Sequence, residues 1–72
     1  MSSLDVRNEI CSGPVLEVMK KLSSLSSTEI LEVLADTSHK DDITRIFGKN
    51  LGHEILHVEL KKEHVKILIK KK

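Results

Sequence analysis

Two runs of alternating apolar and polar residues in the last third of the chain constrain the fold most strongly. In residues 56–60 and again in residues 65–70, an apolar residue stands at every second position. This two-residue period predicts strands with one buried face. The polar residues 61–64 between the two runs have the length of a hairpin loop, so we expect antiparallel neighbours.

Two more strands are predicted earlier in the chain. Residues 3–7 alternate apolar and polar side chains, which predicts a first strand. Residues 29–35 carry apolar bulk on both faces and are interpreted as a central strand. Asn8 follows the first strand and tolerates the left-handed backbone of a sharp turn.

Two helices fill the intervals between these strands. From Gly13 to about Leu25 apolar residues recur at helical spacing, and Pro14 suits the first turn because its missing N–H is no loss there. A short second helix follows a polar loop and buries the apolar residues of 43–47. We expect Asp42 to cap its start, and Gly48 or Asn50 to end it in a left-handed conformation.

The predicted order is therefore β-α-β-α-β-β. A chain of 72 residues buries only a thin core, which suits two layers with one apolar face per element. The expected fold is α+β, a two-layer α/β sandwich in which a four-stranded mixed sheet carries two helices on one face. We expect residues 1–72 to form a single domain.

Charge and composition exclude several partners. Twelve Lys and Arg balance eleven Asp and Glu, and Phe47 is the one aromatic residue, so direct nucleic-acid binding is not expected. The basic end, Lys70 to Lys72, is interpreted as a solvated tail, with a phosphate-binding patch as the alternative. No apolar run is long enough to span a bilayer, and residues 1–5 lack the basic-then-apolar pattern of a secretory signal. We therefore expect a soluble, cytoplasmic protein without a membrane partner.

Cys11 is the only cysteine in the sequence, which excludes an internal disulfide and favours a reducing compartment. A cysteine at a helix N-terminus has a lowered pKa, because exposed amides and the helix dipole favour the anion. Ser12 and Gly13 leave those amides uncovered, and Arg7 ends the first strand near the same corner. The alternative is a small hydrophobic side chain packed under the helix, and spacing does not separate the two interpretations.

Several segments together resemble one known family. These are Leu4-Asp5-Val6-Arg7, Cys11 with Pro14 three residues later, Lys21-Leu22, Asp36 with Asp42-Ile43 six residues later, Gly52-His53-Glu54, and Ile67-Leu68-Ile69-Lys70. In order and spacing they resemble the small TusA-like (SirA-like) sulfur-carrier family over essentially the full length of the chain.

The resemblance implies a function. Cys11 would accept sulfane sulfur as a persulfide from a donor protein of cysteine desulfurase or rhodanese type and pass it to an acceptor protein, toward tRNA thiolation or sulfur metabolism. It implies a carrier rather than a turnover enzyme, without a cofactor, and we expect a monomer. Arg7, Lys20 and Lys21 are interpreted from their charge as docking residues.

Three departures from the family pattern keep a second function open. Ser12 replaces the first proline of the motif, Asn8 replaces the usual glycine, and Thr37 stands where a loop proline is common. Ser12 restores an N–H and removes a rigid constraint beside the sulfur, or caps the helix itself. The alternative function is a non-catalytic interaction or regulatory module on the same fold, with Cys11 structural or redox-sensing.

A metal site is not expected. The four histidines at positions 39, 53, 57 and 64 offer suitable ligand types. On one strand, however, His53 and His57 would lie about 13 Å apart, too far for one ion. We expect His53 at the surface or at a strand edge.

Overall fold

The structure, a computed structural model, describes residues 2–7 and 13–72. The predicted order β-α-β-α-β-β is confirmed, with the second helix built from three consecutive helical segments. In chain order the elements are β1 (Ser2–Asp5), α1 (Gly13–Ser23), β2 (Ile30–Asp36), the 3₁₀ turn η1 (Thr37–His39), α2 (Lys40–Ile43), the π-helical η2 (Thr44–Asn50), β3 (Glu54–Leu60) and β4 (His64–Lys70).

The described strands form a four-stranded mixed sheet in the order β1-β2-β4-β3. β1 pairs parallel with β2, whereas β4 pairs antiparallel with both β2 and β3. The predicted hairpin is therefore confirmed. A register shift between Ile55 and His57 interrupts β3, which leaves Leu56 without a direct partner on β4.

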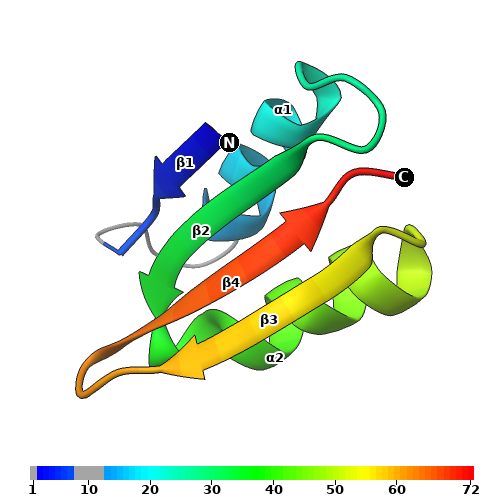
Figure 1. Cartoon of the computed structure of the whole chain (residues 1–72). Helices are drawn as coiled ribbons and strands as arrows, with labels where there is room; N and C mark the ends of the chain where they lie inside the picture. The colour runs from blue at the N-terminus through cyan, green and yellow to red at the C-terminus, as the bar shows by residue number, and fades with distance from the viewer. Residues whose placement is uncertain (1, 8–12) are drawn as a thin grey trace.

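Both helical segments cover the same face of the sheet, as Figure 1 shows, with α1 behind β1 and β2 and α2 behind β3. The expected two-layer α+β sandwich is thus confirmed. The core lies between the layers, because every second residue of β2 and β4 points into it. Its buried apolar side chains are Val6, Val18, Leu22, Leu31, Val33, Ala35, Ile43, Phe47, Val65, Ile67 and Ile69.

The opposite face of the sheet carries ion pairs instead of a second helical layer. Lys66 of β4 lies between two carboxylates of neighbouring strands, 3.8 Å from Glu32 and 3.7 Å from Glu59. Lys61 adds a contact of 3.2 Å to Glu59 and lowers the pKa of that carboxyl. This half-exposed charge pattern is typical of a sheet face turned to water.

Helix α1 begins at Gly13 as predicted and holds Pro14 buried in its first turn. It ends at Ser23, two residues earlier than predicted. The reason is local, since the hydroxyl groups of Ser23 and Ser24 donate to the carbonyls of Lys20 and Lys21 at 2.8 and 2.7 Å. Side-chain bonds of this kind satisfy the last carbonyls of a helix.

The predicted capping role of Asp42 is wrong. Helical structure already begins at Thr37, and Asp42 is the third residue of α2. Its carboxylate accepts a hydrogen bond from Arg45 Nη2 at 3.0 Å. The side chain therefore stabilises the outer surface of the helix, three residues from its partner, rather than the first turn.

The predicted left-handed stop at Gly48 or Asn50 is also wrong. Both residues lie inside η2, where the helix widens so that the N–H of Leu51 donates to the carbonyl of Ile46 at 3.0 Å, five residues back. The positive φ falls later, at Gly52, with a value of 77°. The helix is thus extended beyond the predicted stop.

The sheet has two distinct ends. At one end β1 and β2 finish and β4 begins, with Asp36 opposite His64; the chain enters residues 8–12 there. At the other end β2 begins and β4 finishes, with Ile30 opposite Lys70. Helix α1 runs from the first end towards the second, so its first and last turns lie at different ends of the molecule.

Candidate functional site

Cys11, the predicted chemical centre, lies outside the described residues, as do Asn8 and Ser12. The structure describes the frame on either side of this segment. Arg7 precedes it, two residues after the end of β1, and Gly13 follows it as the first residue of α1. Cys11 therefore belongs to the five residues, 8–12, that join Arg7 to Gly13 in the connection from β1 to α1.

The first side of the frame is a tight turn made by Asp5 and Arg7. One carboxylate oxygen of Asp5 accepts the backbone N–H of Arg7 at 3.0 Å, and the carboxylate also accepts three guanidinium hydrogen bonds of 2.7 to 3.1 Å. These bonds lower the pKa of Asp5 to about 2 and raise the pKa of Arg7. The turn fixes the point from which the Cys11 segment leaves the sheet.

The other side of the frame is the start of α1. The first four N–H groups of a helix lack intrahelical partners and give its N-terminus a partial positive charge. No acidic side chain lies in the first turn of α1 to offset that charge. Cys11 precedes Gly13 by two residues in the sequence, so this end of α1 is the one that favours a thiolate.

Arg7 also lines a polar hollow at this end of the sheet, with a volume of about 260 Å³. The other described residues around it are Asp36, Glu63 and His64. The hollow is rich in charge, but the guanidinium of Arg7 is already bound to Asp5. The structure thus groups Arg7 with the β3–β4 hairpin rather than with the other residues predicted to dock partners.

Those other residues, Lys20 and Lys21, lie in the last turn of α1. The ammonium of Lys20 lies 3.9 Å from Glu17, one turn earlier on the same helix. Basic side chains at this position complement the negative end of the helix dipole. Their location separates them from Arg7 by most of the length of α1, so the three basic residues do not form one patch.

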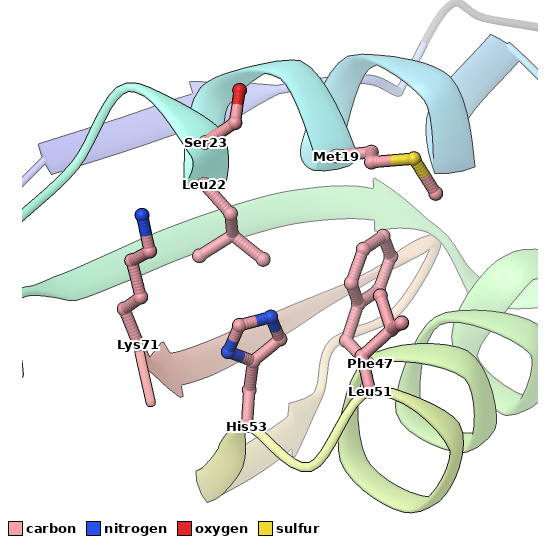
Figure 2. A pocket seen from close by; sticks show the side chains of 7 residues that line it. All are labelled: Met19, Leu22, Ser23, Phe47, Leu51, His53 and Lys71. Carbon is pink, nitrogen blue, oxygen red and sulfur yellow. The ribbon is translucent and has the colours of Figure 1, made fainter. Parts of the chain in front are cut away.

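A second hollow, which sequence reasoning missed, is an apolar groove at the far end of α1. It has a volume of about 260 Å³. Its described walls come from α1, from η2 and the turn after it, and from the residue after β4: Met19, Leu22, Ser23, Phe47, Leu51, His53 and Lys71. Figure 2 shows Leu22, Phe47 and His53 pointing towards one another across this groove.

The sequence did not predict the groove, because the helical spacing of apolar residues in α1 places Met19 among the core residues. In the structure Met19 is 43% exposed, and Leu16, one turn earlier, is 52% exposed. The apolar positions of α1 therefore extend beyond the stripe that the sheet covers. The available signal was the width of that apolar face, which exceeds what one sheet face buries.

His53 forms the floor of the groove on the side of β3. Its ring centroid lies 6.5 Å from that of Phe47, and its Nδ1 accepts the backbone N–H of Lys72 at 3.1 Å. Burial and the ammonium groups of Lys71 and Lys72 lower the pKa of His53. The predicted surface or strand-edge position is correct in part: His53 precedes β3 and is half-buried.

Within residues 2–7 and 13–72, no three His, Cys, Asp or Glu side chains converge in a way that would hold a metal ion. No helix in the same ranges combines the length and the apolar character needed to cross a bilayer.

A family model described as sulfurtransferase TusA matches residues 2–71. The chain belongs to the TusA family. The match covers both sides of the frame around Cys11 as well as both hollows, so the predicted TusA-like (SirA-like) family is confirmed.

Relatives of this TusA-family chain are named as sulfur carriers. Proteins named "Putative sulfur carrier protein" in Archaeoglobus fulgidus and in Methanocaldococcus jannaschii are each 35% identical to it, over 72 and 71 residues. The alignments cover 99% of this chain in both cases, and 97% and 95% of the two relatives.

A solved structure agrees with the fold. The crystal structure of a SirA-like protein from Desulfitobacterium hafniense superposes with a TM-score of 0.78, covering 97% of this chain and 96% of the other. At 20% identity this similarity concerns the fold that the two chains share.

Proposed function

We propose that this chain is a persulfide carrier whose working atom is Cys11 Sγ. One observation carries the proposal: the only cysteine of a TusA-family chain stands two residues before a helix whose first turn has no acidic side chain. Such a position favours the thiolate, which is the form that attacks sulfur.

The transfer step needs no oxidant and no cofactor. The Cys11 thiolate attacks the outer sulfur of a persulfide on the donor protein, and a new sulfur–sulfur bond forms at Cys11. The bond between the outer sulfur and the donor cysteine breaks, and the donor cysteine leaves as a thiolate. One sulfur atom moves, the negative charge passes to the donor, and the net oxidation state is unchanged.

The second half of the cycle is the same step with the roles exchanged. A thiolate of an acceptor protein attacks the outer sulfur of the Cys11 persulfide, and Cys11 is released as a thiolate. The donor is a protein of cysteine desulfurase or rhodanese type, and the acceptor leads to tRNA thiolation or to sulfur metabolism. A small domain with its cysteine in a connection between two elements suits successive docking to both.

Intact-mass spectrometry tests the function directly. Purified protein is incubated with a cysteine desulfurase and cysteine, or with a rhodanese and thiosulfate, beside a Cys11→Ser control. We expect a gain of about 32 Da per chain that dithiothreitol removes and the control lacks. A folded protein that gains no mass with either donor contradicts the proposal and supports a non-catalytic interaction module instead.

The reactivity of the thiol gives a second, independent readout. A thiolate favoured by the helix N-terminus is alkylated at neutral pH faster than a free model thiol. Alkylation that occurs only after unfolding would place Cys11 in the core and oppose the carrier function.

A further inference from the structure

The apolar groove at the far end of α1 has the size of a protein-binding pocket. Its volume of about 260 Å³ lies below the roughly 300–1,000 Å³ that small-molecule sites occupy. Met19 and Leu51 form its rim, and each is 43% exposed. A pocket of this kind accepts one large apolar side chain, as the anchor residues of protein interfaces do.

One face of α1 connects the groove with the first turn of the helix, at Gly13. Leu16, Met19 and Ser23 are spaced by three and four residues and so lie on the same side of the helix. At 1.5 Å per residue, Met19 stands about 9 Å along the helix axis from Gly13. A partner bound in the groove therefore reaches the Cys11 end by lying along Leu16.

The charge around the groove is positive. Lys71 lines it, and Lys72 donates its backbone N–H to His53 on its floor. None of the described residues that line it is acidic. Burial lowers the pKa of His53, and the positive charges of Lys71 and Lys72 lower it further. A partner segment complementary to this site carries acidic residues around its apolar anchor.

We propose that this groove is the docking site for an acidic segment of a relay partner, whose large apolar side chain inserts between Met19 and Leu51. The inference rests on the proposed function for the identity of the partner, but not for the groove itself. Its bound segment runs along Leu16 towards Cys11, so that docking and sulfur transfer use the two ends of one helix.

Binding of a defined probe tests the groove without any sulfur chemistry. The probe is a synthetic glutamate-rich peptide with one central leucine. Its binding is measured by NMR of the ¹⁵N-labelled protein and by fluorescence anisotropy of the peptide. We expect saturable shifts at Met19, Leu51 and His53, and a binding constant that falls as salt is raised. Replacing the central leucine of the peptide by alanine, or its glutamates by lysines, should abolish the shifts.

Two pairs of variants localise the binding. Leu51→Glu should weaken binding of the peptide by about tenfold or more. Leu60→Glu, at a residue 60% exposed at the end of β3, should leave the binding unchanged. Lys72→Glu should weaken it, whereas Lys62→Glu, in the exposed loop between β3 and β4, should not. Absent shifts, shifts outside the groove, or equal binding of the lysine peptide would overturn the proposal.

Sulfur loading then separates failure of the groove from failure of the proposed function. With a cysteine desulfurase as donor, Leu51→Glu should raise the half-saturating donor concentration several-fold and leave the limiting rate unchanged. Loading by inorganic polysulfide, which needs no docking, should not change. If the wild type takes no sulfur from the protein donor, the carrier function fails, while the peptide measurement still decides the groove.

Sedimentation of the protein without peptide addresses one other occupant. A dimer that dissociates in Leu51→Glu but not in Leu60→Glu would place a second copy of the chain in the groove. That result would overturn the assignment to an acidic partner segment.

Discussion

His53 and Lys72 are joined across the end of the sheet: the backbone N–H of Lys72 donates to Nδ1 of His53 at 3.1 Å. An imidazole nitrogen that accepts a hydrogen bond carries no proton, so the neutral ring holds its proton on Nε2. Protonation of Nδ1 would break this bond and add a charge beside Lys71 and Lys72. Burial and these two ammonium groups accordingly lower the pKa of His53.

The lowered pKa of His53 predicts that its protonation destabilises the fold. The group takes up its proton more readily in the unfolded chain, whose histidine pKa is about 6.5. Its contribution to the free energy of unfolding is complete above that value and is lost as the pH falls towards the folded pKa. Chemical denaturation between about pH 7 and pH 5 should therefore show a smaller loss of stability in His53→Asn than in the wild type.

NMR of the imidazole nitrogens checks the same assignment directly. We expect the Nε2–H tautomer for His53 and a titration midpoint below that of a free histidine. An Nδ1–H tautomer, or a wild-type stability curve parallel to that of His53→Asn, would contradict the prediction.

Asp5 and Arg7 predict a second pH dependence, at acid pH. Asp5 has a folded pKa of about 2, lowered from 3.8 by its bonds to Arg7. The carboxylate stabilises the fold above about pH 4, and that stabilisation is lost as the pH falls through the folded pKa. Asp5→Asn should lower the Tm at neutral pH by a few degrees at most, because the pair is exposed.

The pH dependence of the stability difference between wild type and Asp5→Asn tests this prediction. The Tm difference between wild type and Asp5→Asn should shrink as the pH is lowered through the carboxyl range. A difference that stays constant down to acid pH would mean that the carboxylate makes no charged contact with Arg7 in solution.

Two neighbouring residues of β4 test which face of the sheet holds the core. Ile67 is fully buried between the layers, whereas Leu68 lies half-buried on the opposite face. Ile67→Ala should lower the free energy of unfolding by about 2–5 kcal/mol, through lost burial and the cavity that remains. Leu68→Ala should cost less than half as much. Urea denaturation midpoints measure both, and equal losses would contradict the assignment of the faces.

Backbone conformation at Thr28 predicts a stabilising substitution. Thr28 has a φ of 68°, a left-handed conformation that is unfavourable for a β-branched residue. Glycine removes this cost of about 1–2 kcal/mol. Ordering the more flexible glycine on folding costs less than that, so Thr28→Gly should raise the free energy of unfolding by about 0.5–1 kcal/mol. Its backbone N–H still donates to the carbonyl of Lys71.

Gly52 supplies the opposite control for Thr28. Its φ is 77°, and an added Cβ would meet only the flexible side chain of Lys72, whose nearest atom, Nζ, would lie 3.5 Å away. Gly52→Ala should therefore lose about 1 kcal/mol through the backbone alone. Thermal unfolding of both variants checks the pair, and a destabilised Thr28→Gly would contradict the prediction.

The two ends of the second helix differ from the sequence prediction. Asp42 and Gly48 are good local signals for a cap and a stop, yet both lie inside the helical stretch. Such signals report what a short peptide prefers. Here the buried side chains of Ile43 and Phe47 hold the segment against the sheet, and that packing outweighs the preference of a single residue.

Part of the candidate site can be predicted from the sequence, and part of it requires the tertiary structure. Cys11, its position before α1 and the family motif are properties of the sequence, because they depend on residue identity and short spacing. The groove is not, since its walls come from three separate stretches of chain: Met19 from α1, Leu51 and His53 from the turn after η2, and Lys71 from the residue after β4. Only the tertiary fold brings them to one end of the sheet.

The sequence by itself determined the order of the elements, the final hairpin and the family, because alternation and helical periodicity are local and each selects one kind of element. The tertiary structure decided which side chains of α1 remain exposed, how far the second helix extends, and what lies beside the last residues of β4. These depend on how much apolar surface one four-stranded sheet covers. That quantity is set only when all the strands are in register, and it leaves Leu16, Met19 and Leu51 at the surface.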